Sequence, residues 1–161
     1  MSEDQGLYLD EFTEELAREI CSWRYAHPYD VYDWPSWEDL VAEEEDIVKD
    51  EVRKDEFRAL FDREDNYCGF VHFDNIGESH IRIKLGLMPE MTGRGIGGHF
   101  LALITEEVKR RLPDGLVDLE VLTWNKRAIK VYERSGFKIV ETYERKTPTG
   151  KAEFHRMELQ L

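Results

Sequence analysis

The chain has 161 residues, 41% of them hydrophobic, and a formal net charge of −13 at pH 7. This length suits one domain with one core, so we expect a single domain over residues 1–161. The negative charge argues against nucleic acid as a partner, because phosphate contacts need clustered Lys and Arg. No apolar run approaches the roughly 20 residues that span a bilayer. With no signal-peptide pattern either, the sequence predicts a cytoplasmic protein without a membrane partner.

The charge is divided unevenly along the chain. Residues 1–90 carry 25 acidic and 9 basic side chains, a net −16, whereas residues 91–161 carry 10 acidic and 13 basic, a net +3. The second part therefore suits a polyanionic ligand, and the first can attract a cationic substrate. The alternative is that the acidic runs are solvated helix faces that keep the protein soluble.

Two helices are predicted near the N-terminus. Thr13 is suited to cap a helix that ends near Tyr25, because Pro28 disfavours helical backbone just before it. Ser36 is suited to cap a second helix that runs towards Val48. A short strand at residues 7–9 precedes both helices.

The rest of the chain alternates strands with two further helices. A glycine after Ser135 marks the end of the second of these helices, which Asn125 is suited to cap. Together the elements predict an α/β fold whose mixed sheet is flanked by helices. The expected strands lie at residues 57–61, 67–73, 80–87, 116–122, 137–145 and 151–161, and the expected helices at 100–111 and after Asn125.

A glycine-rich turn, Gly93-Arg94-Gly95-Ile96-Gly97-Gly98, joins the strand at 80–87 to the following helix. Its N–H groups point outward at the positive end of the helix dipole, which favours an anion such as a pyrophosphate. The turn also satisfies GxGxxG, the fingerprint of dinucleotide-binding folds. The residues that follow, however, predict a strand, a short helix and a hairpin rather than repeated βαβ units.

Two segments together resemble the GNAT superfamily of N-acetyltransferases. The glycine motif of that superfamily is Gln/Arg-x-x-Gly-x-Gly/Ala; Gly95 and Gly97 match it, but Thr92 stands where Arg or Gln is usual. This departure removes a side-chain anchor for the cofactor. The downstream signature Asn-x-x-Ala-x-x-x-Tyr-x-x-x-Gly-Phe is complete at Asn125, Ala128, Tyr132, Gly136 and Phe137. The clear resemblance covers residues 80–145.

The resemblance implies a GNAT fold with a central, mostly antiparallel mixed sheet. It also implies acetyl transfer from acetyl-CoA to a primary amine, by direct attack in a ternary complex. The N–H of Leu87 would polarise the thioester carbonyl, and Tyr132 would protonate the departing thiolate as general acid. The residues that the resemblance places at acetyl-CoA are Leu87, Met88, Thr92, Gly93, Arg94, Gly95, Ile96, Gly97, Gly98, Asn125, Ala128 and Tyr132.

The alternative for Tyr132 is a half-buried packing residue. The general base is not identified by the sequence: His72, His80 and His155 all lie on predicted strands and are comparable candidates. No pair of His, Cys or Asp residues has metal-ligand spacing, so we predict no metal.

The acceptor pocket is predicted between the first two helices. Tyr29 and Tyr32 would hold an ammonium group by cation–π contact, with Asp30 and Asp33 as counter-charges. The alternative is that the aromatic residues pack the helices onto the sheet and the aspartates form turns. We expect a small cationic amine as the acceptor. A basic peptide, acetylated at its N-terminus or at lysine, and a CoA-binding module without turnover remain alternatives, and the resemblance also suggests a homodimer.

Overall fold

The computed structural model describes residues 6–161, which form two compact units. One unit comprises the described residues up to His72 together with Leu85–Arg94, and the other comprises Phe73–Lys84 with Gly95–Leu161. The single domain expected over residues 1–161 stays a prediction. Across residues 6–161, no helix is both long enough and apolar enough to cross a bilayer.

Seven strands are hydrogen-bonded in the order β1-β2-β3-β4-β5-β7-β6. Strands β4 and β5 pair in parallel, whereas β1–β2, β2–β3, β5–β7 and β6–β7 pair antiparallel. This confirms the predicted α/β fold with a mixed sheet. The strands are β1 (Tyr8–Glu11), β2 (Phe57–Phe61), β3 (Tyr67–Gly77), β4 (His80–Leu87), β5 (Leu116–Leu122), β6 (Lys138–Thr147) and β7 (Gly150–Gln160).

In the described chain, three α-helices follow β1 in succession, and two more lie between later strands. The α-helices are α1 (Glu14–Ile20), α2 (Trp37–Ala42), α3 (Asp50–Glu56), α4 (Gly97–Arg111) and α5 (Lys126–Arg134). Short 3₁₀ turns are η1 (Tyr29–Tyr32), η2 (Asp46–Val48) and η3 (Pro89–Met91).

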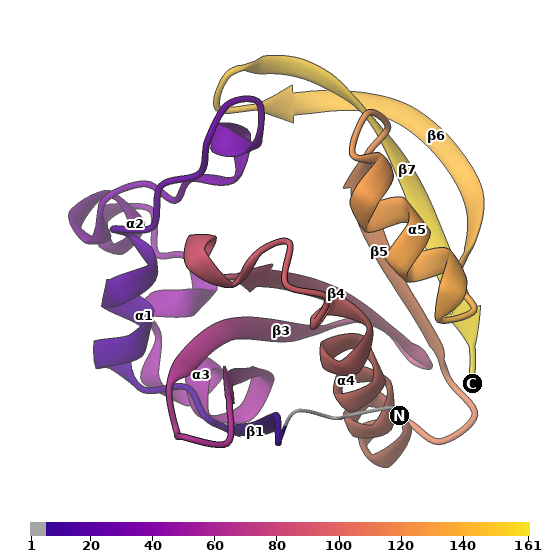
Figure 1. The fold of residues 1–161 in the computed structure, drawn as a ribbon, viewed down its shortest axis with the longest axis horizontal. Coiled ribbons are helices and arrows are strands. Elements are labelled where there is room, and N and C mark those ends of the chain that lie inside the picture. Colours follow the sequence, from indigo (N-terminus) through magenta and orange to yellow (C-terminus); the bar gives the residue numbers. More distant parts are fainter. Residues whose placement is uncertain (1–5) are drawn as a thin grey trace. The chain divides into compact units, whose positions relative to one another are not determined.

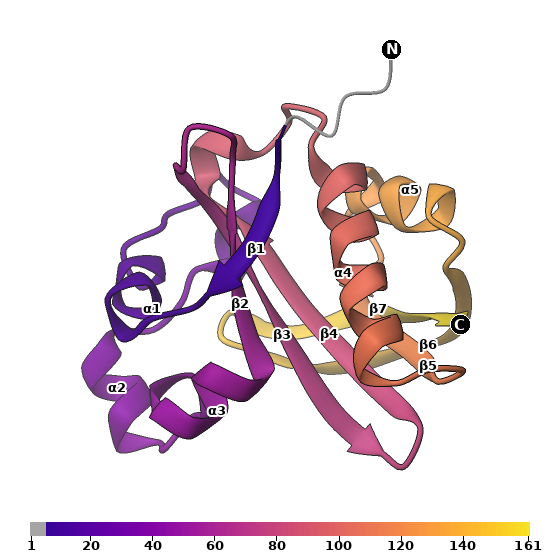
Figure 2. The ribbon, with the colours of Figure 1, turned by 90° about the horizontal axis from the view of Figure 1, so that it is seen from below.

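In the first unit, α1, α2 and α3 lie beside strands β1 and β2 (Figure 2). Ile20 of α1 and Leu40 of α2 are buried in one cluster with Phe57 of β2 and Phe70 of β3. The helices thereby cover apolar side chains that the strands present on one face.

The predicted caps of the first two helices are confirmed, but their predicted ends are wrong. Thr13 accepts a hydrogen bond from the N–H of Leu16 at 3.3 Å, and Ser36 accepts one from Asp39 at 3.1 Å. The first helix ends at Ile20, where i→i+3 bonds replace the helical pattern. The second ends before Glu44, whose φ of 54° is left-handed and does not continue a helix.

The second unit places α4 beside α5 (Figure 1). Phe100, Leu101 and Ile104 of α4 are fully buried, and so are Val117 and Leu119 of β5 at 1% exposure each. The strands predicted at 80–87 and 116–122 are confirmed at both ends. The longer helix begins at Gly97, three residues before the predicted start, because the glycines themselves form its first turn.

Candidate active site

The first turn of α4 is open to a ligand. Ile96, which precedes this turn, has no polar side-chain atom that could cap its N–H groups. Gly95 adopts a φ of 78°, a conformation that favours glycine. A methyl group at Gly95 or Gly98 would meet no heavy atom beyond the turn within 4 Å, so open space lies beside both residues. The backbone N–H groups of this turn and the helix dipole together suit a bound anion.

Helix α5 packs close to this turn. A methyl group at Gly97 would lie 3.5 Å from the side chain of Val131, which puts the two helices in van der Waals reach there. Asn125 is buried, and its Oδ1 accepts a hydrogen bond from the N–H of Ala128 at 3.3 Å. Asn125 therefore caps α5, as predicted. Tyr132 is half-buried, with its ring centroid 6.2 Å from that of Phe137.

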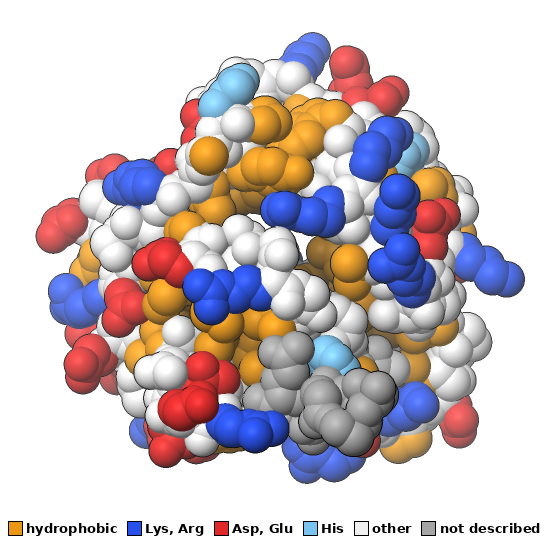
Figure 3. Space-filling view, in the orientation of Figure 1, with side chains coloured by type: hydrophobic (Ala, Val, Ile, Leu, Met, Phe, Trp, Pro, Cys, Tyr) orange, Lys and Arg blue, Asp and Glu red, His pale blue; other side chains and the backbone are white. Residues whose placement is uncertain are grey.

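The outer face of α5 is basic. Lys and Arg side chains gather over this helix in the space-filling view (Figure 3). Because the spacing is close to one helical turn, these side chains share a face. They favour anionic ligands near α5. The exposed basic residues of the helix are Lys126, Arg127, Lys130 and Arg134.

In the first unit, the end of β4 is held by neighbouring groups. The phenol of Tyr25 donates a hydrogen bond of 2.6 Å to the carbonyl oxygen of Leu87, and the N–H of Met88 donates to Cys68 O at 2.8 Å. A methyl group at Gly69 would lie 2.5 Å from the carbonyl oxygen of Gly86, so the two backbones are in close contact. The backbone around Leu87 is therefore fixed from two sides.

The segment after β4 forms a compact turn. Thr92 Oγ1 donates to the carbonyl oxygen of Pro89 at 2.7 Å, which closes η3. Gly93 follows with a φ of 74°, and Arg94 is exposed. The side-chain hydroxyl of Thr92 thus closes the short turn that precedes the glycine turn, at the position where the family motif has Arg or Gln.

A cavity of about 340 Å³ lies beside the end of β4 in the first unit. Two of its lining side chains, Glu19 and Glu90, are carboxylates, and Trp23 supplies an indole ring. The one basic lining residue, Arg24, donates hydrogen bonds of 2.9 Å to the carbonyl oxygens of Cys21 and Trp23. Its Nη1 is therefore held by backbone, and its Nε lies 4.0 Å from Asp33 Oδ2. The lining residues are Glu19, Ser22, Trp23, Arg24, Met88, Pro89 and Glu90.

The segment predicted to hold the acceptor, with Tyr29, Asp30 and Tyr32, forms η1. It follows the cavity-lining residue Arg24 in sequence. The carboxylate of Asp33 accepts the N–H of Tyr25 at 3.0 Å, a turn-forming contact. Asp30 Oδ1 lies 3.3 Å from His27 Nδ1. Tyr32 is 38% exposed. Glu19 and Glu90 are not predicted as site residues from the sequence, because carboxylates in an acidic chain carry no distinguishing signal.

Each histidine that was considered as a base has a partner. His72 Nε2 lies 2.8 Å from Glu56 Oε1, and His155 Nδ1 lies 2.8 Å from Thr142 Oγ1. His80 Nε2 lies 2.9 Å from a carboxylate oxygen of Asp118, but without hydrogen-bond alignment. These contacts do not single out one histidine as the general base.

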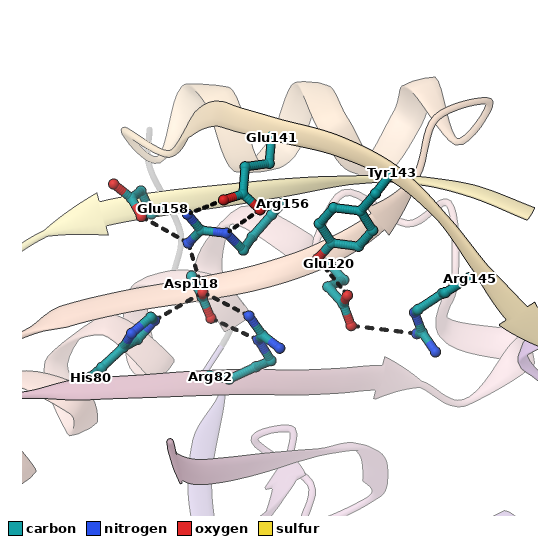
Figure 4. A network of polar contacts seen from close by, with 9 residues as sticks. All are labelled: His80, Arg82, Asp118, Glu120, Glu141, Tyr143, Arg145, Arg156 and Glu158. Carbon is teal, nitrogen blue, oxygen red and sulfur yellow. Dashed lines mark hydrogen bonds and ion pairs between the residues drawn. The ribbon is translucent and has the colours of Figure 1, made fainter. Parts of the chain in front are cut away.

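A polar network surrounds Asp118 in the second unit (Figure 4). Asp118 is fully buried, and Arg82 binds its carboxylate through two hydrogen bonds of 3.0 Å. Arg156 adds a third hydrogen bond, at 2.9 Å. Burial alone raises the pKa of Asp118, but the two arginines outweigh it and hold the pKa below its usual value. Beside it, Tyr143 donates to Glu120 at 2.6 Å.

The pairing of β4 with β5 is short. Its register runs from His80–Leu116 to Arg82–Asp118, whereas β5 stays paired with β7 as far as Leu122. Within the second unit, β5 therefore continues beyond the last residue that pairs with β4.

Comparison with known proteins gives a family and a fold. The profile described as "Acetyltransferase (GNAT) family" matches residues 11–137. No curated protein matches the chain. A chimera of the Vibrio cholerae spermidine N-acetyltransferase SpeG and hSSAT has a TM-score of 0.80 at 18% identity, over 96% of this chain and 95% of the other. Vibrio cholerae spermidine N-acetyltransferase in complex with CoA and spermine has a TM-score of 0.78 at 18% identity, over 96% and 95%.

Proposed function

The chain belongs to the acetyltransferase (GNAT) family, and from that membership we propose which amine it acetylates and which residues take part. It is an acetyl-CoA-dependent N-acetyltransferase, with acetyl-CoA as the donor and an amine as the acceptor. The proposed acceptor is a small cationic amine of the polyamine type. It enters the cavity lined by Glu19 and Glu90.

The cavity carries this proposal. Two carboxylates and an indole ring attract and cover an ammonium group, and the neighbouring guanidinium of Arg24 is held by backbone carbonyls. Solved structures of similar fold are spermidine N-acetyltransferases, one of them in complex with CoA and spermine. Tyr29, Asp30, Tyr32 and Asp33 are proposed as a second set of contacts for a long acceptor. The net charge of −16 over residues 1–90 steers cations to this part of the chain.

The open turn of α4 is proposed to bind the donor. The N–H groups from Gly93 to Gly98 suit its pyrophosphate, and the space beside Gly95 and Gly98 lets the ligand approach the backbone. Arg94 and the basic face of α5 add positive charge for the remaining phosphate. Met88, Thr92 and Ile96 belong to the same segment of chain and are proposed to contact the donor through their backbones. Asn125 and Ala128 act by fixing the start of α5.

Two groups are proposed to act on the reacting atoms. The N–H of Leu87 polarises the thioester carbonyl as negative charge develops on its oxygen, a contribution of about 3–4 kcal/mol for one such donor. Tyr132 gives its proton to the departing thiolate, which is a fair leaving group, so we expect about 10²-fold from this acid. Placing the amine against the thioester supplies more of the rate.

Steady-state thiol release with different acceptors tests this proposal. Spermidine and spermine should have a higher kcat/KM than a peptide with a free N-terminus or a lysine. Glu19→Gln and Glu90→Gln should each raise the KM for spermidine about tenfold, a loss of about 1.4 kcal/mol of binding, and leave that for acetyl-CoA unchanged. Glu15→Gln, an exposed carboxylate on α1 outside the cavity lining, is the matched control.

Three outcomes would contradict it. Equal effects of all three substitutions on the KM for spermidine would mean that the overall negative charge of the chain, and not the cavity, attracts the acceptor. A higher kcat/KM for peptides would favour a protein N-terminal or lysine acetyltransferase. Thermal stabilisation by acetyl-CoA without turnover on any amine would indicate a CoA-binding module. A comparison with NADH, which should not stabilise the chain, excludes a general affinity for dinucleotides.

A further inference from the structure

Three potential metal ligands from separate elements meet in the first unit. Asp46 begins η2, Glu56 ends α3, and His72 lies on β3. One ligand atom from each lies within 4.8 Å of the other two. They are 10 and 16 residues apart in sequence, which is not a spacing that predicts a metal site. Only the fold brings them together.

The histidine of this cluster is held in one orientation. The side chain of His72 is 95% buried, since 5% of it is exposed, and its ring stacks on that of Phe57 with centroids 4.0 Å apart and planes at 5°. Its Nε2 points at Glu56 Oε1, 2.8 Å away. A metal ligand held by packing needs little ordering when the ion binds.

We propose that Asp46, Glu56 and His72 bind one divalent transition-metal ion, which ties η2 and α3 to β3. The ion would replace the proton of the hydrogen bond between His72 Nε2 and Glu56 Oε1. Two ligand atoms at about 2.1 Å from one ion are about 3.4 Å apart in a tetrahedral site and at most about 4.2 Å apart in any geometry, so the cluster must contract when the ion binds. Asp46, whose side chain is 50% exposed, can supply this movement.

The donor set and its charge select the class of ion. One imidazole nitrogen with carboxylate oxygens suits Mn²⁺ or Zn²⁺, whereas Mg²⁺ and Ca²⁺ favour oxygen ligands alone. Two carboxylates balance the charge of a divalent ion. Lys49 competes with the ion for Asp46, because its Nζ lies 3.8 Å from Asp46 Oδ1. Its side chain is 51% exposed and can move into solvent.

Mn²⁺ binding to the full chain, followed by electron paramagnetic resonance and calorimetry, tests the site. We expect one Mn²⁺ per chain and a Tm higher by about 5–10 °C at 100 times the Kd, since that concentration adds about 2.7 kcal/mol of stability. Asp46→Asn and Glu56→Gln should each weaken binding at least about tenfold. Asp55→Asn, an equal loss of charge at an exposed position next to Glu56, should leave it unchanged. Lys49→Met should tighten binding.

A second readout separates a built site from a charged surface. Zn²⁺, which is diamagnetic, should shift the side-chain ¹⁵N resonances of His72 at one equivalent and leave those of His155 in place. Absence of saturable binding would overturn the proposal. So would equal weakening by Asp46→Asn and Asp55→Asn, or a shift of both histidines alike. None of these measurements depends on acetyl transfer, so the proposal stands or falls apart from the acceptor.

Discussion

The phenol of Tyr25 reaches across 62 positions of sequence to donate a 2.6 Å hydrogen bond to the carbonyl oxygen of Leu87. Burial, together with Asp33 and Glu90, raises the pKa of Tyr25 well above its usual value. The phenol therefore keeps its proton and remains a donor across the working pH range. It holds the carbonyl of the peptide unit that follows the proposed thioester-polarising N–H.

Tyr25→Phe should lower kcat about tenfold, which corresponds to a barrier increase of about 1.4 kcal/mol. The KM for acetyl-CoA should change little. The loss of one neutral hydrogen bond should cost about 1 kcal/mol of stability. Steady-state kinetics and urea unfolding measure the two effects separately. Tyr67→Phe, which removes a 3.2 Å hydrogen bond to Leu16 O, is the control and should affect stability alone. Equal kinetic loss in both variants would assign Tyr25 a purely structural role.

Gly98→Ala should separate cofactor binding from folding. The added methyl group has no neighbour within 4 Å in the protein, and alanine favours a helix by up to about 1 kcal/mol over glycine. Stability should therefore hold or rise, whereas the Kd for acetyl-CoA should rise about tenfold or more. Calorimetric titration and thermal unfolding measure both. Gly77→Ala at the end of β3 is the control; unchanged affinity in Gly98→Ala would place the donor away from the turn.

Tyr132→Phe should lower kcat about 10²-fold with little change in the KM for either substrate. The phenol proton is needed only as the thiolate leaves, so ground-state binding does not change. Thiol release with spermidine measures the effect. Tyr8→Phe removes a phenol from β1, where its partner is Asp65, and should leave kcat intact. Full activity in Tyr132→Phe would leave packing against Phe137 as its role.

Asp118→Asn should destabilise the fold by about 3 kcal/mol at neutral pH, because it leaves Arg82 and Arg156 without their buried partner. The pKa of Asp118 is lowered in the folded state, so its stabilisation is present above the ordinary carboxyl value of about 3.9. It is lost as pH falls through the lowered value.

Urea unfolding between about pH 5 and pH 2 measures this linkage. The parent chain should lose more stability over this range than Asp118→Asn. Glu153→Gln, an exposed carboxylate on β7, should behave like the parent. Parallel curves for all three proteins would mean that Asp118 contributes nothing to acid sensitivity.

The elements with a local signal were predictable from sequence. Thr13, Ser36 and Asn125 cap helices as their side chains suggest, and β4 and β5 end where their alternation of residues ends. Helix α3 was not predicted, because its first turn has no side-chain cap and its composition is mostly charged. Its stability comes from tertiary contact, which local propensity does not contain.

The candidate site divides in the same way. The glycine turn and the start of α5 are local motifs and were predicted in place. The cavity, the hydrogen bond between Tyr25 and Leu87, and the network at Asp118 join distant positions. One signal was available for the network: His80, Arg82, Asp118 and Arg156 interrupt apolar strands at alternate positions. Their pairing across strands required the register of β4, β5 and β7.

The backbones of β3 and β4 come into close contact at Gly69 and Gly86. A side chain at Gly69 would strike the carbonyl oxygen of Gly86 at 2.5 Å, and one at Gly86 would strike the ring of Phe70 at 2.7 Å. A residue other than glycine at either position would therefore have to displace the backbone or the ring of Phe70. The close approach at these two glycines thus adds to the hydrogen bonds that hold the backbone at Leu87. Efforts to change the acceptor can alter the cavity walls freely but must leave both glycines alone.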